Sequence, residues 1–306
     1  MNFWILILLG VIQGLTEFLP ISSSGHLVLL YNIFGIKNDT VILSIILHLA
    51  TLLAVIVYYR KDIWLLIKNP FCATNIKILI TTIVTGLVVL IIKPIIDVGF
   101  QGVYLPIFFV LTGVLLWISD WFNKSKSIGL KNVDIDLSTP TNLPITYTQA
   151  VVIGVSQGIA CIPGISRSGT TIAVSKIIGV GNVSAKYSFL ISFPTILASL
   201  FVQLLSGETM SNINVFGLLV SMLICFLVGL ACIKVMTEFV KKSSLKIFSF
   251  YLFAISIFML MNDLFLHLFW LILYSFCSIL GIQWTIFVII DIINKKISRK
   301  KWKQFK

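Results

Sequence analysis

Seven long apolar runs limit what this chain can fold into. Each is long enough to cross the roughly 30 Å hydrocarbon core of a bilayer as a helix. Of all residues, 58% are hydrophobic and 11% are charged, whereas soluble domains are about 25% charged. The sequence therefore predicts an all-α polytopic membrane protein, with spans at about residues 41–59, 77–96, 103–122, 186–205, 214–236, 246–263 and 267–293.

Two further apolar segments, residues 3–35 and 147–181, are each interrupted by a centre rich in Gly, Pro and Ser. Neither half of either segment is long enough to span a bilayer. This pattern is typical of a re-entrant helical hairpin, which enters and leaves the membrane on the same side.

The two interrupted segments are copies of each other. Residues 10–26 read GVIQGLTEFLPISSSGH and residues 154–170 read GVSQGIACIPGISRSGT, with eight identities and no gap at an offset of 144. Three spans follow each hairpin, and because that number is odd, the two repeats should have inverted topology. We expect a first repeat at 1–122, a cytoplasmic linker at 123–146, a second repeat at 147–263, and an extra transmembrane helix with a basic tail at 264–306.

The basic residues predict the orientation. With the N-terminus outside, the loops and tail that face the cytoplasm hold 20 of the 23 Lys and Arg residues, as the positive-inside rule requires. The net charge of +12 is thereby explained by topology, and we expect no nucleic-acid partner. The protein should lie in the cell membrane with its C-terminus cytoplasmic, in contact with membrane lipids.

Polar side chains are concentrated in both hairpins, where burial in lipid makes them costly. The first hairpin carries an acid and a base, Glu17 and His26, and the second carries a guanidinium, Arg167. If the two centres meet near the midplane, these groups would form a site for a phosphorylated ligand. The hydroxyls and the amide that would line it belong to Ser22, Ser23, Ser24, Ser166, Ser168, Thr171 and Gln13.

Each of these residues also has a structural explanation. A serine in a membrane helix often bonds its own backbone, and Gln13 and Gln157 could pin the two hairpins together. Glu17 could be an anchor and Arg167 a cation that reaches the membrane surface, while His48 in the first span fits a role in packing or in supporting residues of the site. Cys161 replaces Glu17 in the second copy, which predicts that only one hairpin supplies the acid.

At these motifs the sequence resembles the undecaprenyl-diphosphate phosphatases of the bacitracin-resistance type. The first matching motif runs from Gln13 through Glu17 and Pro20 to the stretch Ser22-Ser23-Ser24-Gly25-His26. The second reads Pro163-Gly164-Ile165-Ser166-Arg167-Ser168-Gly169-Thr170-Thr171. The resemblance covers about residues 1–263.

The resemblance implies hydrolysis of undecaprenyl or another polyprenyl diphosphate to the monophosphate and inorganic phosphate. This reaction would recycle the lipid carrier for cell-envelope glycan synthesis and confer bacitracin resistance. Glu17, Ser23, His26 and Arg167 would be catalytic, at a site that opens to the outer face. A divalent cation, Mg²⁺ or Ca²⁺, would bind at Glu17, with no organic cofactor. Gln13 stands at the motif position that can also be Glu, so the motif supplies one carboxylate here.

Several alternatives stay open from the sequence. A serine hydroxyl or a water could attack the phosphorus, with His26 or Glu17 taking the proton. Inverted repeats with broken helices also suit a flippase for polyprenyl phosphate or a secondary transporter. An intramembrane serine protease, prompted by residues 164–169, lacks the strand–turn–helix context of a nucleophile elbow. The sequence leaves open whether the protein is a homodimer.

Overall fold

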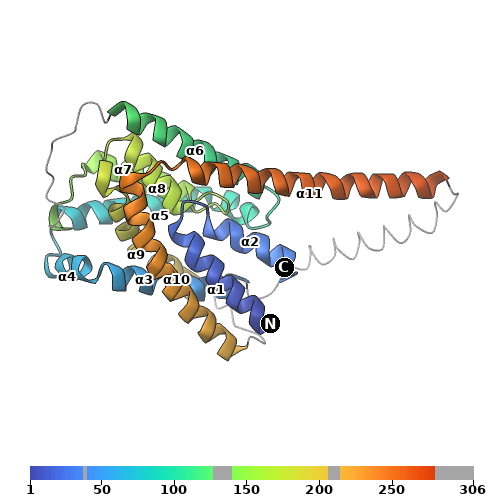
Figure 1. The fold of residues 1–306 in the computed structure, drawn as a ribbon. Helices are drawn as coiled ribbons and strands as arrows, with labels where there is room; N and C mark the ends of the chain where they lie inside the picture. Colours follow the sequence, from blue (N-terminus) through green and yellow to red (C-terminus); the bar gives the residue numbers. More distant parts are fainter. Residues whose placement is uncertain (37–39, 127–139, 206–213, 280–306) are drawn as a thin grey trace. The chain divides into compact units, whose positions relative to one another are not determined.

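The computed structural model describes residues 1–36, 40–126, 140–205 and 214–279 (Figure 1). The chain divides into two compact units, residues 1–256 and residues 257–306. The following description concerns the first unit. In the second unit, the chain is helical up to Ile279. Residues 280–306, which hold the end of the predicted last span and the basic tail, lie outside the described residues. So do residues 127–139, which make up most of the predicted linker.

The described residues form helices and turns, without strands. Four described helices are long and apolar enough to cross a membrane by themselves: α5 (Ala73–Gly99), α6 (Leu105–Lys126), α9 (Ser184–Leu205) and α10 (Val215–Lys242). A fifth span is present if α3 (Thr40–Tyr58) and α4 (Arg60–Lys68), which are bent by 79° relative to each other, are counted as one. The prediction of a multi-pass, all-helical membrane protein is confirmed.

Large apolar side chains on the outside of these helices fit a lipid environment. On α5, Leu90 and Ile91 are 72% and 78% exposed. Only a small share of the most apolar part of this helix is buried against the rest of the protein. Water would make such a surface unfavourable, whereas lipid chains do not.

Each of the two interrupted segments is a pair of short helices, as predicted. The first pair is α1 (Phe3–Phe18) and α2 (Ser23–Ile33), and the second is α7 (Tyr147–Ile159) and α8 (Arg167–Ile177). The longest, α1, has 16 residues and is therefore about 24 Å long, less than the thickness of the hydrocarbon core. The second pair is interrupted at Pro163-Gly164, where Gly164 has a φ of +97° that favours glycine.

The first helix of each pair packs against a long helix from the other half of the sequence. Helix α1 packs against α10, and its counterpart α7 packs against α5. The hydrogen bonds at these two contacts correspond: Ser221 Oγ donates to Leu6 O at 2.6 Å, and Thr81 Oγ1 donates to Ala150 O at 3.0 Å. Because Leu6 and Ala150 are equivalent at the offset of 144, each short helix is held by a long helix from the other half of the sequence.

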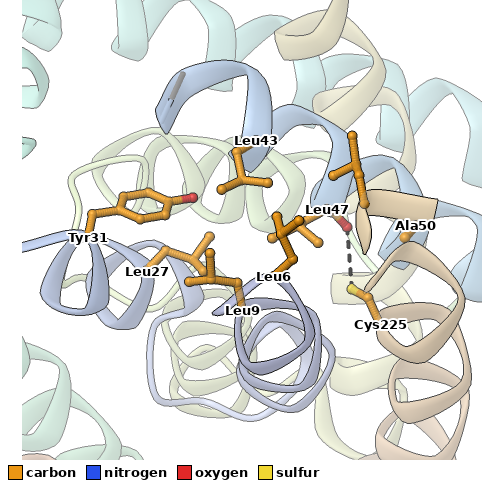
Figure 2. Packing of buried hydrophobic residues seen from close by; sticks show 9 residues of the cluster. Leu6, Leu9, Leu27, Tyr31, Leu43, Leu47, Ala50 and Cys225 are labelled. Atoms are coloured by element: carbon orange, nitrogen blue, oxygen red, sulfur yellow. Dashed lines mark hydrogen bonds between the residues drawn. The ribbon is translucent and has the colours of Figure 1, made fainter. Parts of the chain in front are cut away.

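A buried apolar cluster fixes α1 and α2 against α3 and α10 (Figure 2). Cys225 of α10 lies at its edge, and its thiol donates to Leu47 O at 3.5 Å. The cluster comprises Leu6, Leu9, Leu27, Tyr31, Leu43, Leu47, Ala50, Leu218 and Cys225. This packing fixes the first half of α1, the helix that carries Glu17 near its other end.

Two features differ from the sequence prediction. The cytoplasmic loop expected at 60–77 contains the helix α4. The break expected between the spans 246–263 and 267–293 is absent, since α11 (Lys246–Ile279) is continuous there. The intervening residues, Leu264-Phe265-Leu266, include no Gly or Pro that would end a helix.

Candidate functional site

Glu17, near the end of α1, is the centre of the polar cluster. Its side chain is almost fully buried, at 3% exposed. One carboxylate oxygen, Oε2, accepts hydrogen bonds from Ser23 Oγ at 2.5 Å and from Gln13 Nε2 at 3.0 Å. The other, Oε1, is paired with the guanidinium of Arg167. The carboxylate thus joins a hydroxyl from the first helix pair to a cation from the second.

Ser23 and Arg167 occupy equivalent positions in the two copies. Each is the first residue of its helix, α2 or α8, and they are separated by the offset of 144. The residues before them, Ser22 and Ser166, are the N-caps: their hydroxyls accept from the amides of Gly25 at 3.2 Å and Gly169 at 3.1 Å. The N-terminal ends of α2 and α8, where the helix dipoles are positive, are therefore both directed toward the Glu17 carboxylate.

The centres of the two pairs are in direct contact. Ser22 Oγ donates to Ile165 O at 3.4 Å, and Ser168 Oγ donates to Leu19 O at 3.1 Å. The backbones approach so closely that a Cβ on Gly25 would lie 2.9 Å from Gly164 Cα. This contact leaves no room for a side chain at Gly25, and the φ of +97° favours glycine at Gly164.

A small cavity opens beside the Glu17–Arg167 pair. Arg167 keeps 20% of its side chain exposed, so part of its guanidinium is free to meet a ligand. The cavity is lined by Glu17, Phe18, Arg167, Ser168, Ser188, Phe189 and Ser192. The start of α8, a guanidinium and hydroxyls around one cavity are a suitable environment for a phosphate group.

Ser23 is the one predicted hydroxyl that bonds Glu17 directly in the described structure; Ser24 and Thr171 lie further from the carboxylate. Ser24 Oγ is 3.5 Å from Ser22 Oγ and is partly exposed. Thr171 is fully buried; its hydroxyl lies 2.9 Å from Arg167 O and 2.5 Å from Ser188 Oγ. Thr171 therefore supports α8 and the cavity wall from behind.

His26 is directed toward α11 and α6. Its Nδ1 lies 2.7 Å from Ser22 O and its Nε2 lies 2.6 Å from Tyr251 Oη. The ring is stacked on Tyr251 at a centroid distance of 5.7 Å and lies 5.3 Å from the ring of Phe109. Both ring nitrogens are thus engaged within the protein.

Sequence reasoning left His48 out of the candidate site and gave it a role in packing or in supporting site residues; the structure places it beside Glu17. Its Nε2 lies 3.4 Å from Glu17 Oε2, and its Nδ1 donates to Ser44 O at 2.7 Å. The signal was present, because an ionisable residue inside an apolar span is functional by default. Ser188 and Ser192 on α9 were also missed, and only the tertiary fold reveals that they line the cavity.

The two glutamines do not pin the hairpins to each other. Gln13 donates to Glu17 within its own helix, and Gln157 donates to Thr85 at 3.0 Å and to Thr195 at 2.9 Å. Gln13 therefore belongs to the Glu17 cluster, while Gln157 fastens α7 to α5 and α9.

A metal site made of protein groups alone is absent from the described residues, which contain no group of three or more His, Cys, Asp or Glu side chains. The donor set nevertheless fits Mg²⁺, which is commonly held by one carboxylate together with phosphate oxygens of a substrate. Glu17 supplies the carboxylate, and the buried Oε1 of Gln13 accepts no hydrogen bond from the described residues.

Comparison with known proteins identifies the family. The family model described as "Bacitracin resistance protein BacA" matches residues 6–258. An undecaprenyl-diphosphatase from Carboxydothermus hydrogenoformans is 36% identical over 263 residues, which cover 84% of this chain and 96% of the relative. An undecaprenyl-diphosphatase from Methanobrevibacter smithii is 32% identical, and the match covers 86% of this chain and 98% of the relative. One from Christiangramia forsetii is 37% identical, and the match covers 82% of this chain and 94% of the relative. The chain therefore belongs to the bacitracin resistance protein BacA family.

Proposed function

We propose that this protein hydrolyses a polyprenyl diphosphate, in the first place undecaprenyl diphosphate, to the monophosphate and inorganic phosphate. One observation carries the proposal: the Glu17 carboxylate is shared by the hydroxyl of Ser23 and the guanidinium of Arg167 at two converging helix starts. An acid, a nucleophile and an anion-binding cation are the groups that phosphoryl transfer needs. The relatives named undecaprenyl-diphosphatase support the choice of substrate.

The frame for this site is a pair of inverted-topology repeats, at 1–122 and 147–263, each a re-entrant hairpin followed by three spans. The exchanged packing of α1 on α10 and of α7 on α5 supports it, as does the shortness of the four hairpin helices. An odd number of crossings between the copies brings one hairpin in from each side of the membrane. The helix starts of α2 and α8 would then meet within the bilayer.

The lipid would bind with its prenyl chain among the apolar helix surfaces and its diphosphate at the cavity. Arg167 would exchange part of its contact with Glu17 for the terminal phosphoryl group, which offers oxygens to the planar guanidinium fork. Ser24, Ser168 and the amides at the starts of α2 and α8 would bind the remaining oxygens. Movement of Arg167 toward the phosphate would leave Glu17 free to take a proton.

The chemical step follows from the short Ser23–Glu17 contact. Ser23 Oγ attacks the terminal phosphorus and its proton passes to Glu17 Oε2, 2.5 Å away. The bond from phosphorus to the bridging oxygen breaks, and polyprenyl monophosphate leaves. Water then attacks the phosphorus of phosphoserine and the bond from phosphorus to Ser23 Oγ breaks. Glu17 returns its proton to Ser23 Oγ, one proton of the water passes to solution, and inorganic phosphate leaves. Arg167 and the helix starts stabilise the charge on the equatorial oxygens in both steps.

A divalent cation would be held by Glu17, by the Oε1 atom of Gln13 and by oxygens of the bound diphosphate. When bound, it would neutralise charge that develops on the phosphate oxygens. The residues of the chain would still position the substrate and transfer the proton, as described above.

The orientation follows from the basic residues, which favour an outside N-terminus and a cytoplasmic C-terminus. We infer that the site is open to the outer face of the cell membrane, where a carrier is left as the diphosphate once its glycan has been transferred. Hydrolysis there would return the carrier to use in cell-envelope glycan synthesis. It would also confer the bacitracin resistance that the description of the family names.

A flippase on the same frame is the less favoured function, because the relatives are named as hydrolases. Purified protein in detergent, where no second leaflet exists, separates the two functions. We expect release of inorganic phosphate from undecaprenyl diphosphate, and less from a short-chain prenyl diphosphate that lacks most of the apolar tail. Absence of phosphate release by folded protein, together with lipid movement in liposomes, would refute the diphosphatase.

A further inference from the structure

The turn before α2 is strained. Ser22 has a φ of +69° and is the one described non-glycine residue with a positive φ. Such a backbone conformation is costly for an L-residue and persists only where neighbouring groups enforce it. The conformation matters for the site, because Ser22 directly precedes Ser23, whose hydroxyl contacts Glu17.

His26 is the residue that holds this turn. The carbonyl oxygen of Ser22 receives the backbone amide of His26 at 3.2 Å and the ring Nδ1 at 2.7 Å. Since a carbonyl oxygen can only accept, Nδ1 carries the ring proton and Nε2 is left with a lone pair. A second group is required to keep the ring in this tautomer and orientation.

Tyr251 of α11 supplies that group. Its hydroxyl lies 2.6 Å from His26 Nε2 and must be the donor, and its ring is stacked on the imidazole at an interplanar angle of 11°. Residues on either side of it anchor α11 to α6: Phe250 contacts Trp117, and Ser256 Oγ donates to Pro106 O at 2.8 Å. The tyrosine is thereby placed on a fixed part of the frame.

The other hairpin has a comparable support. Thr112 of α6 is fully buried; its hydroxyl donates to Gly164 O at 3.3 Å and accepts from the amide of Ser166 at 3.2 Å. In the sequence, α6 is the last helix of the first half and α11 follows α10 in the second. Each broken centre is therefore held by a helix from the opposite half.

On this geometry, we propose that Tyr251 is a positioning residue of the diphosphatase: through His26, it holds the Ser22 turn that presents Ser23 to Glu17. The inference rests on the function proposed above and deepens it. It assigns His26 to positioning, because both of its ring nitrogens are engaged and neither faces Glu17. Tyr251 itself touches no group that binds the diphosphate.

The test is Tyr251→Phe, which removes the hydroxyl and keeps the ring. We expect kcat for phosphate release to fall about tenfold, the effect of one lost hydrogen bond on an aligned site, with KM unchanged. Tyr59→Phe is the control, since it removes the hydroxyl of a more deeply buried tyrosine, 3.5 Å from Thr237 Oγ1, and should leave kcat unchanged. A kcat equal to that of wild type in Tyr251→Phe would overturn the proposal.

Two His26 variants separate positioning from proton transfer. The amide of His26→Asn can still donate to Ser22 O, so this variant should retain more activity than His26→Ala. Introducing Tyr251→Phe into His26→Ala should cause no further loss, because the tyrosine acts only through the imidazole. Equal loss in the Asn and Ala variants, or a full additional loss in the double variant, would contradict positioning.

A readout without substrate keeps this inference separate from the proposed function. The chain has three histidines, so ¹⁵N-histidine NMR can resolve the His26 ring. Tyr251→Phe should shift its Nε2 resonance and leave the other two histidines in place. If wild type released no phosphate but this shift occurred, the substrate assignment would fall while the support of His26 by Tyr251 would stand; an unmoved Nε2 resonance would refute that support.

Discussion

At the scale of single residues, the two copies have diverged where the chemistry is expected. Glu17 is replaced by Cys161 in the second copy, and Arg167 takes the position that Ser23 has in the first. Two equal hairpins would place equal charges opposite each other, which repel. Divergence instead produces a carboxylate, a hydroxyl and a guanidinium in mutual contact.

This asymmetry leads to a matched pair of variants. Glu17→Ala should lower kcat for phosphate release by about 10³-fold, because it removes the proton acceptor of Ser23. Cys161→Ala, at the equivalent position of the second hairpin, should stay within about twofold of wild type, since a general acid–base effect needs the carboxylate. Comparable losses in both variants would show that Glu17 acts through packing.

Gln13 leads to a prediction about the cation. A chelator should reduce phosphate release and added Mg²⁺ should restore it, because Mg²⁺ would neutralise the diphosphate oxygens. Gln13→Glu adds a second carboxylate beside Glu17 and should lower the Mg²⁺ concentration needed for half-maximal rate. Activity that is insensitive to chelator would contradict a role for a divalent cation.

At the scale of helices, glycine decides where the short helices meet the long ones. A Cβ on Gly154 of α7 would lie 2.8 Å from Thr81 O of α5, and a Cβ on Gly10 of α1 would lie 2.5 Å from Ser221 O of α10. Backbone atoms cannot move aside as a flexible side chain can. Close helix approach through small residues is the usual way in which membrane helices associate.

Gly154→Ala should therefore destabilise the protein, by about 1–3 kcal/mol for overpacking at a backbone contact. Gly86→Ala is the control, because it lies in α5 and a Cβ there would meet nothing within 4 Å. Thermal unfolding in detergent should show a lower Tm for Gly154→Ala and no decrease for Gly86→Ala. Equal Tm values in the two variants would contradict the close contact of α5 and α7.

The helix pattern was largely readable from the sequence. Pro20 and the pair Pro163-Gly164 predicted the interruptions, because proline and a left-handed glycine end a helix locally. The bend between α3 and α4 and the continuity of α11 were not predicted. The chain around Tyr59 has no Gly or Pro that would mark the bend, and Leu264-Phe265-Leu266 include none that would end α11.

At the scale of the whole molecule, the basic residues determine which side of the membrane each loop occupies. Phe71, between α4 and α5, should face the cytoplasm, and Val103, between α5 and α6, should face outside. They are 90% and 66% exposed, so a cysteine at either position can react.

Labelling of intact cells tests this orientation. In a background without native cysteines, Val103→Cys should react with a membrane-impermeant maleimide, whereas Phe71→Cys should react only after the membrane is made permeable. Since a thiolate reacts only where the reagent reaches it, the reverse pattern would invert the proposed topology and close the site to the outer face.

The composition of the site was predictable only in part. The duplicated motifs identified Glu17, Ser23 and Arg167, because polar groups in lipid are costly and stand out from an apolar background. The approach of His48 to Glu17 and the contact of Tyr251 with His26 depend on packing between distant helices. A single sequence contains no signal of such pairings.

The most direct test of the account compares phosphate release from undecaprenyl diphosphate by wild type, Glu17→Gln, Arg167→Ala and the double variant. If the two side chains serve one site, each single variant should lose most of the activity, by about 10²–10³-fold or more, and the double variant should be little worse than the singles. Near-wild-type turnover in both single variants, or losses that multiply in the double variant, would contradict a shared Glu17–Arg167 site.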